Sequence, residues 1–532
     1  MTVRRFAWAL PALFLACSSS SDEDPPPVPN PTVEKPRHKP QVFPPLLDAP
    51  TTREKTLVVK TTKQKDTDGP NPSATPEALD DYLNRGFGDL VDGPGEEYAT
   101  RVIDDSTPPA PGPNAKRILR FVHLADTQLA DDESPTRLGQ FDSAGSTSSA
   151  LRPQDAYLCH MANASVRTIN ALHAKDPIAF TLLGGDNADS AQSDEVGWIL
   201  GILSGADDIE CDSGNNDEII DGPDNDGKDP FKAEGLKMPW KWVTGNHDVL
   251  VQGNLVVDDA QKAKALTADA FGGTRVYTDG KRGAVERGEG ISIADPRRAL
   301  LTRPELMAKV AANGDGHGIG EAEKASGMAT YTFDAEGTSF RFLVVDTAHE
   351  KGGSEGVVRQ AEVDRVIKPA LDKAKADGKW VILSSHHAIS SIGDGSGFGG
   401  VSGGIPDALT PEKWTELLVG YDNVLFFMVG HSHRHRVRKI EPAAGASGHP
   451  FWEVMTAAIA DYPHQFRTID LFDQDNGWIM MRATCVDFSV EGDPIAAEGR
   501  RRGVVDLTSG WLPREAGVEA NDRNVELWIK KP

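Results

Sequence analysis

The sequence contains little cysteine and few aromatic residues, with four cysteines and 7% Phe, Trp and Tyr among 532 residues. No two cysteines are separated by two residues, which argues against a zinc site built from cysteine pairs. Basic residues are also scarce, since 56 Lys and Arg stand against 80 Asp and Glu and give a net charge of −24. This balance argues against a protein that binds nucleic acid by neutralising many phosphates. A small phosphate-binding site neutralised by metal ions is still allowed.

The sequence has one long apolar run, at residues 6–16, and two arginines precede it directly. A basic start followed by an apolar run too short to cross a membrane is typical of an export signal, so we expect residues 1–16 to be removed. Cys17 follows, and the segment resembles a bacterial lipoprotein signal, which implies a lipid anchor on Cys17. We therefore expect an exported cell-envelope lipoprotein, at the outer membrane or the periplasmic face. The alternative is an ordinary cleaved signal and a periplasmic or secreted protein.

Three cysteines remain after Cys17. An exported protein can oxidise its thiols, so one disulfide is expected and one cysteine is left over. We favour a bond between Cys159 and Cys211, with Cys485 free, although the sequence leaves the other pairings open.

After the expected signal at residues 1–16, composition divides the chain into three further parts. Proline and serine dominate residues 17–50, which cannot bury a core and are expected to form a disordered, lipid-anchored tether. Residues 51–115 form a mixed preamble that we expect to pack on the body, with a β-like run at residues 56–62 and a helix at residues 76–85. The folded body is expected to occupy residues 116–532.

Six apolar, strand-like runs in the body each end at polar side chains that can bind metal. Helical stretches, such as residues 356–376, lie between several of them. Strands that alternate with helices predict an α/β fold, in which side chains at the carboxyl ends of the strands gather at one edge of the sheet. The runs cover residues 118–125, 178–183, 240–243, 340–345, 380–385 and 424–429.

Five motifs at the ends of these runs carry the chemistry. Each motif alone is more often a turn or a helix cap than a site. Taken in order, they resemble the signature of the calcineurin-like metallophosphoesterase family, over roughly residues 118–470. The motifs are Asp126-Thr127-Gln128, Gly185-Asp186, Gly245-Asn246-His247-Asp248, His386 and Gly430-His431-Ser432-His433.

The resemblance implies a fold and an activity. The fold would be a four-layer α/β/β/α sandwich with two mixed sheets. The activity would be hydrolysis of a phosphoric ester, either a monoester or a diester, by a hydroxide that bridges two metal ions. The residues after Gln128 and after the second histidine motif further resemble a bacterial, exported, acid phosphatase-like subgroup.

The resemblance also assigns ligands for two divalent ions. Mixed nitrogen and oxygen donors suit Mn, Fe or Zn, and Mg is a further option. Asp186 would bridge the two ions. The first site would be completed by Asp126, Gln128 and His433, and the second by Asn246, His386 and His431.

His247 and the pair His386 and His387 require separate assignments. By resemblance, His247 protonates the leaving group or stabilises the transition state, and Asp248 orients its ring. His386 and His387 are adjacent at a strand end, so their side chains diverge and only one is expected to reach the site. The family register favours His386.

Gln128 departs from the family pattern, which usually has histidine at this position. An amide oxygen would make the first site harder and weaker, favouring Mn or Mg over Zn. The alternative is that Gln128 binds no metal and only hydrogen-bonds a water molecule at the centre.

Two arginines are candidates for contact with the phosphate of a small phosphate-ester substrate. Arg137 and Arg467 lie in the segments that follow the first and last motifs, and a guanidinium can bind phosphate through two hydrogen bonds. An ion pair is the alternative for each.

The rival function is a noncatalytic, envelope-anchored binding protein that retains the fold. Gln128 and the acidic stretch at residues 211–230 favour it.

Overall fold

The computed structural model describes residues 39–62, 69–145, 147–215, 217, 219, 226–277, 281–397, 403–512 and 520–532. The expected signal peptide, Cys17 and the first part of the expected tether lie outside these residues, as does part of the acidic stretch at residues 211–230. Within the described ranges, no helix is both long enough and apolar enough to cross a membrane.

The described strands and helices alternate through most of the body. The strands are β1 Lys55–Val59, β2 Leu90–Pro94, β3 Ala99–Val102, β4 Lys116–Leu124, β5 Thr181–Leu183, β6 Trp240–Lys241, β7 Ala270–Val276, β8 Ala284–Gly288, β9 Tyr331–Asp334, β10 Phe340–Val344, β11 Trp380–Ser384, β12 Val424–Val429, β13 Arg436–Ile440, β14 Phe451–Met455, β15 Gln465–Asp473, β16 Trp478–Asp487 and β17 Val525–Lys530. The α-helices are α1 Pro76–Asn84, α2 Leu158–Lys175, α3 Ser193–Ser204, α4 Asp259–Ala265, α5 Arg303–Ala311, α6 Glu321–Ser326, α7 Gln360–Glu362, α8 Lys368–Ala376, α9 Pro411–Val419 and α10 Pro494–Thr508, and a π-helical turn η4, Val363–Ile367, joins α7 to α8.

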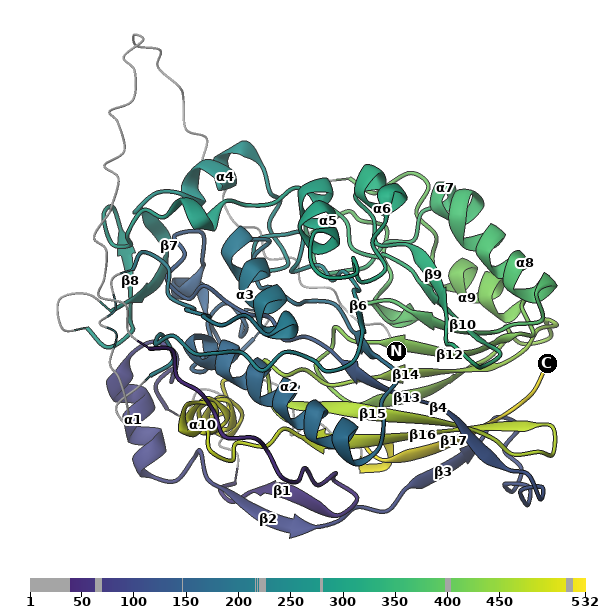
Figure 1. The fold of residues 1–532 in the computed structure, drawn as a ribbon. Helices are drawn as coiled ribbons and strands as arrows, with labels where there is room; N and C mark the ends of the chain where they lie inside the picture. The colour runs from purple at the N-terminus through teal and green to yellow at the C-terminus, as the bar shows by residue number, and fades with distance from the viewer. Residues whose placement is uncertain are drawn as a thin grey trace, which may run out of the picture. The chain divides into compact units, whose positions relative to one another are not determined.

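Two mixed sheets form the centre of the body (Figure 1). The six-stranded sheet has the order β13-β14-β12-β11-β10-β9, and the seven-stranded sheet has the order β3-β17-β16-β15-β4-β5-β6. Neighbours among β4, β5 and β6, and among β10, β11, β12 and β14, run parallel, while β15 and β16 pair antiparallel. The prediction of an α/β fold with two mixed sheets is confirmed.

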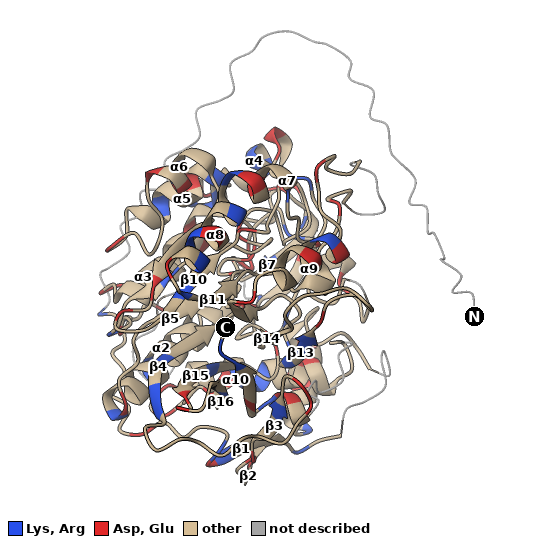
Figure 2. Cartoon of the chain, turned by 90° about the vertical axis from the view of Figure 1, so that its right-hand side faces the viewer, with Lys and Arg blue, Asp and Glu red and all other residues tan. Residues whose placement is uncertain are grey.

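The layers follow from how the parallel strands are connected. Helices α2 and α3 carry the chain from β4 to β5 and then to β6, while α8 and α9 carry it from β10 to β11 and then to β12. Such crossovers are right-handed, and each series advances along its sheet in one direction, so its helices cover one face only. The other two faces meet, with the rings of Phe121 in β4 and Phe342 in β10 edge to face and their centroids 5.4 Å apart. The order of layers is that of the expected four-layer sandwich (Figures 1 and 2).

The preamble contributes directly to the body. Strand β3 pairs in parallel with β17 and adds an edge to the seven-stranded sheet. Helix α1 packs against α10, where Leu79, Tyr82 and Val505 are buried together.

Residues 39–50, which the sequence predicted as tether, also contact the body. The amide of Gln41 donates to the carbonyl of Pro230 at 2.9 Å, and Ala49 is buried. The Phe43 ring lies 6.0 Å from that of Phe231. This contact is favourable because it removes the apolar surface of both rings from water. The packed chain therefore begins before the boundary predicted at residue 50.

A disulfide joins Cys159 to Cys211, with the two Cα atoms 6.6 Å apart. It ties the first turn of α2 to the loop after α3. Cys485 is buried and free. The favoured pairing is confirmed.

Candidate metal centre

The carboxyl ends of strands from both sheets bring predicted ligands together. Asp126 follows β4, Asp186 follows β5 and His386 follows β11. One ligand atom from each of these three buried side chains lies within 4.8 Å of the others. Parallel strands that end at a common edge produce this convergence.

The backbone turns sharply at most of the predicted ligands. Positive φ angles are rare outside glycine and cost free energy that the surrounding structure must supply, and they cluster at functional sites. A Cβ at Gly245 would collide with the Asp186 carboxylate, so glycine is required where the two loops meet. The φ angles are 52° at Asp126, 41° at Gln128, 51° at Asp186, 74° at His431 and 51° at His433.

One half of the centre is built from two imidazoles and an amide. His386 Nε2 lies 2.9 Å from Asp186 Oδ2 and 3.3 Å from His431 Nδ1. The Nδ1 atom of His386 lies 2.8 Å from the carbonyl oxygen of Gly184, which only accepts, so Nδ1 carries the proton and Nε2 faces the centre. Asn246 donates through Nδ2 to Gly253, and its buried Oδ1 has no hydrogen-bond partner among the described residues.

The other half contains Asp126 and His433. His433 Nε2 lies 3.2 Å from Asp126 Oδ1. On the far side of the ring, Nδ1 lies 2.7 Å from Asp461 Oδ2. A carboxylate behind an imidazole fixes its tautomer and the orientation of its ring as a ligand. Carboxylates, imidazole nitrogens held toward the centre and an unsatisfied amide oxygen fit divalent cations.

The side chains of the centre shift one another's pKa values. Burial acts to raise the pKa of Asp186, but the attraction of His386 and His247 is stronger and the pKa is lowered. Burial acts to lower the pKa of His386, and the Asp186 carboxylate outweighs it and raises the pKa to about 9. For His431, burial and the repulsion of His386 both lower the pKa. A neutral His431 offers a lone pair to a cation.

His247 is oriented by Asp189, which corrects the expectation for Asp248. The His247 Nδ1 atom lies 2.9 Å from the Asp189 carbonyl oxygen and 3.0 Å from Asp189 Oδ1. The Asp248 carboxylate instead accepts from the amides of Asn187, Ala188 and Gly245, at 2.8–3.0 Å. The Asp248 carboxylate therefore holds the loop backbone rather than the His247 ring.

His247 keeps its second nitrogen toward the centre. Its Nε2 lies 4.0 Å from Asp186 Oδ2, and its side chain is 10% exposed. Burial acts to lower the pKa of His247, whereas the charge of Asp186 and the hydrogen bond to Asp189 raise it, and the net shift is upward. The ring is therefore placed with Nε2 toward the centre, and its acidic neighbours favour the protonated form.

The structure directs His386, and not His387, toward Asp186. His387 Nδ1 lies 2.8 Å from Thr347 Oγ1, and Nε2 lies 3.2 Å from the carbonyl oxygen of Ser354. Both nitrogens are thus used in hydrogen bonds, although one of them is within 4.8 Å of ligand atoms of His386 and His431.

The two predicted substrate arginines are fully buried, which corrects that expectation. Arg137 pairs with Asp155 and Asp189, both at 2.9 Å. Arg467 donates to His435 Nδ1 at 2.9 Å and to the carbonyl of Asp522 at 2.6 Å. A buried guanidinium needs hydrogen-bond acceptors, which these contacts supply to NH1 and NH2 of Arg137 and to Nε and NH2 of Arg467. Neither arginine reaches the surface.

Gln128 contacts an arginine that sequence reasoning did not single out. Arg152 NH2 donates to Gln128 Oε1 at 2.7 Å, and Gln128 Nε2 lies 3.4 Å from Asp186 Oδ2. Arg152 Nε donates to Asp461 Oδ1, also at 2.7 Å. Asp189 stands three residues after Asp186, a spacing that could have drawn attention to it. Nothing near Arg152 in the sequence marks it.

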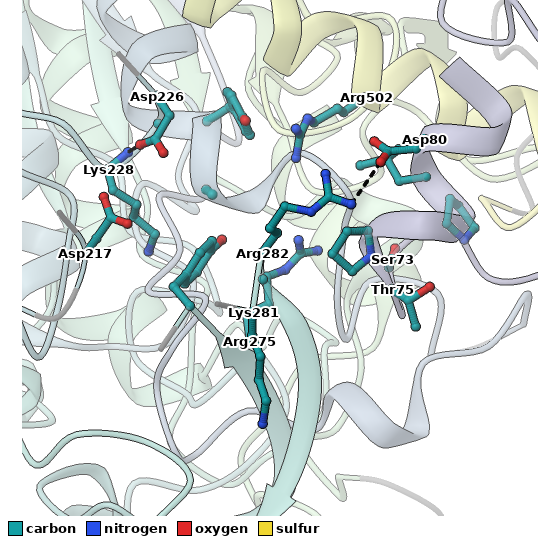
Figure 3. A pocket seen from close by; sticks show the side chains of 18 residues that line it. Ser73, Thr75, Asp80, Asp217, Asp226, Lys228, Arg275, Lys281, Arg282 and Arg502 are labelled. Carbon is teal, nitrogen blue, oxygen red and sulfur yellow. Dashed lines mark hydrogen bonds and ion pairs between the residues drawn. The ribbon is translucent and has the colours of Figure 1, made fainter. Parts of the chain in front are cut away.

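A separate hollow of about 280 Å³ lies between the preamble and the β7–β8 hairpin (Figure 3). None of the predicted site residues lines it. Its cations have partners: Arg282 pairs with Asp80 at 3.0 Å, Lys228 with Asp132 at 2.5 Å and Arg502 with Glu498 at 3.0 Å.

No protein-family model matches the chain, and no curated protein matches it. Among solved structures, purple acid phosphatase PPD1 from yellow lupin (Lupinus luteus) seeds is similar at 12% identity and a TM-score of 0.31, covering 74% of this chain and 55% of the lupin chain. The sulfate thiohydrolase SoxB of Thermus thermophilus is similar at 12% identity and a TM-score of 0.29, covering 77% of this chain and 62% of SoxB. GAP50, the anchor in the inner membrane complex of Plasmodium, shows 11% identity and a TM-score of 0.27, covering 69% of this chain and 84% of GAP50. The chain thus spans less than two thirds of the length of the first two.

Proposed function

We propose that the chain is a dinuclear metal-dependent hydrolase of phosphoric esters, a member of the calcineurin-like metallophosphoesterase family. One observation carries this proposal. The ends of parallel strands in two facing sheets bring carboxylates, imidazoles and an unsatisfied buried amide oxygen to one centre beside His247. The ligand set would be Asp186 between the ions, Asp126 and His433 on one side, and Asn246, His386 and His431 on the other, with Gln128 adjacent.

Divalent cations in such a centre act as Lewis acids toward phosphoryl oxygens and lower the pKa of a bound water. The chain's own residues orient the imidazole rings and supply a proton to the leaving group. Asp461 holds His433, and Asp189 holds His247 with Nε2 toward the centre. A protonated His247 donates its Nε2 proton to the departing ester oxygen, which would otherwise leave as an alkoxide.

The charge distribution supports a small ester as the substrate. A net charge of −24 opposes stable binding of nucleic acid, and Lys and Arg are interspersed with Asp and Glu along the cartoon drawn in Figure 2. Arg137 and Arg467 are engaged in buried contacts and so add no free cation for a dianionic monoester. Within the proposal, a singly charged diester is therefore the better substrate.

We further propose that the protein is exported and anchored through lipid on Cys17. The bond between Cys159 and Cys211 supports export, because disulfides persist in oxidising compartments. The mass of the mature N-terminal peptide tests the anchor. A free cysteine or a different first residue would exclude it.

The activity is tested on the full-length chain, stripped of metal and reloaded with Mn, Fe, Zn or Mg. Hydrolysis of bis-p-nitrophenyl phosphate and p-nitrophenyl phosphate is measured for the wild type and for Asp186→Asn and His247→Ala. His449→Ala is the matched control, because His449 is exposed and lies outside the centre. We expect the control to retain activity and the other two variants to lose it. Binding of fewer than two ions with no turnover would favour a noncatalytic binding protein.

A further inference from the structure

The side-chain amide of Gln128 has its two ends fixed by its neighbours. Oε1 lies 2.7 Å from Arg152 NH2, and Nε2 lies 3.4 Å from Asp186 Oδ2. A guanidinium only donates hydrogen bonds and an ionised carboxylate only accepts them. The oxygen must therefore face Arg152, and the NH2 group must face Asp186. The reverse orientation would set donor against donor and acceptor against acceptor.

Arg152 has little freedom to release this oxygen. Its side chain is 1% exposed, and its Nε donates to Asp461 Oδ1 at 2.7 Å. NH1 lies 3.9 Å from Asp155 and 3.8 Å from Asp189, so carboxylates surround the guanidinium. The planar fork holds Asp461 and Gln128 in one geometry.

The same arginine contacts both Gln128 and the carboxylate that holds His433. Asp461 uses Oδ1 for Arg152 and Oδ2 for His433 Nδ1, at 2.7 Å each. Arg152 thus orients His433 through Asp461 while it turns Gln128 directly. If the Gln128 amide rotated to offer oxygen to a metal ion, it would leave the buried NH2 group of Arg152 without this acceptor.

We propose that Gln128 is a hydrogen-bond donor to the metal centre and not one of its ligands, and that Arg152 is the positioning residue that imposes this orientation. The proposal rests on the proposed function. It leaves Asp126, Asp186 and His433 as the protein ligands of the first ion. The Gln128 NH2 group is then directed toward an oxygen held beside Asp186.

The first test measures metal affinity rather than turnover. Mn²⁺ is titrated by calorimetry into the metal-free, full-length wild type, Gln128→Met and Asp126→Asn, with bound metal counted by mass spectrometry. Gln154→Met is the matched control, because Gln154 is also fully buried and its Nε2 donates to the Ala460 carbonyl. We expect Gln128→Met and the control to keep two ions within about threefold of the wild-type affinity, and Asp126→Asn to weaken one ion at least tenfold.

A tenfold loss in Gln128→Met alone would make Gln128 a ligand and overturn the inference, while the proposed function would stand. A wild-type chain that binds none of Mn²⁺, Fe²⁺, Zn²⁺ and Mg²⁺ would overturn the proposed function and this inference with it.

The second test addresses Arg152 through a double-mutant cycle. Arg152→Lys keeps the charge but cannot hold Asp461 and Gln128 in one planar fork. In this background the Gln128 amide is released and can offer its oxygen, so Gln128→Met should now weaken Mn²⁺ binding at least threefold. An equal effect of Gln128→Met in both backgrounds would overturn the positioning role. Circular dichroism and the unfolding midpoint verify that each variant is folded.

Discussion

Among single residues, Asp189 and Asp248 are the two acids near His247. We expect replacement of Asp189 to lower kcat and replacement of Asp248 to lower stability. Asp189 contacts the ring, so Asp189→Asn removes the charge that holds the imidazolium. We expect kcat to fall roughly 10- to 100-fold, with KM and metal content little changed. Steady-state kinetics on the diester, with metal analysis, checks this.

Asp248→Asn is the comparison for that substitution. Its carboxylate accepts from three backbone amides, and an asparagine has one acceptor oxygen in place of two. We expect the free energy of unfolding to fall by about 1–3 kcal/mol, from urea titration. If Asp248→Asn lowered kcat as much as Asp189→Asn at unchanged stability, the assignment of the orienting acid would be wrong.

The contrast between these two acids shows what sequence could and could not predict about the centre. Asp126, Asp186 and His386 were predictable because each lies just beyond an apolar run that forms a strand. The residues that hold the ligands in place, such as Arg152 and Asp461, were not predictable. Arg152 and Asp461 are 309 residues apart in sequence, and only the folded chain brings them to 2.7 Å. A buried arginine has no local pattern that distinguishes it from an exposed one.

At the scale of elements, the disulfide is expected to contribute to stability through the chain length that it closes. Cys159 and Cys211 are 52 residues apart. Closing such a loop restricts the unfolded chain by about 4 kcal/mol in the entropic model. We expect the double variant Cys159→Ser/Cys211→Ser to unfold at lower urea, with a loss of about 2–4 kcal/mol.

Cys485→Ser is the control for the disulfide variant. The Cys485 thiol donates to the Arg523 carbonyl, and a serine hydroxyl can make the same bond. A disulfide variant no less stable than this control would show that the bond adds nothing to the folded state.

Helix α10 begins at a carboxylate whose ionisation should make stability depend on pH. Asp493 caps the helix by accepting from the Ala496 amide at 2.8 Å. Burial raises the pKa of Asp493 to about 6, although this hydrogen bond and Arg167 oppose the rise. The protonated form is favoured by folding, so its stability is present below the unfolded pKa near 4 and is lost as pH rises through about 6.

Asp493→Asn keeps a good cap and removes this titration. We expect its unfolding free energy to fall less than that of the wild type between about pH 4 and about pH 7, by on the order of 1–3 kcal/mol. Urea titrations across this range measure the difference. Parallel pH dependences of the two proteins would contradict the expected cost of ionising Asp493.

The elements themselves were predicted unequally. Strand β12 has the predicted bounds, because a run of six buried apolar residues fits a strand covered on both faces. The helix predicted at residues 356–376 starts four residues later, since Gly356 and Arg359 form bridges with Ile392 and Ala408. The antiparallel strands β15 and β16 were not predicted, because their pairing joins segments whose alternation is interrupted by buried polar residues such as Thr468 and Thr484.

At the scale of the whole molecule, the centre draws its donors from both sheets. Asp126, Asp186 and Asn246 come from loops after strands of the seven-stranded sheet, while His386 and His431 follow strands of the six-stranded sheet. A cation bound by both sets cannot stay bound when the sheets separate. Metal binding and the packing of the two sheets should therefore be thermodynamically coupled.

This coupling predicts how hydrogen exchange responds to metal. At 100 times the dissociation constant, Mn²⁺ should raise the free energy of unfolding by about 2.7 kcal/mol for each ion that binds only the folded chain. Amide exchange should then slow at the ends of β5 and β12 together, although these strands belong to different sheets. Asp186→Asn should abolish the slowing in both strands, because Asp186 belongs to the seven-stranded sheet and its Oδ2 lies 2.9 Å from His386 Nε2 of the other sheet. Protection confined to one sheet would mean that the cation is bound by that sheet alone, and the centre would not join the two halves of the sandwich.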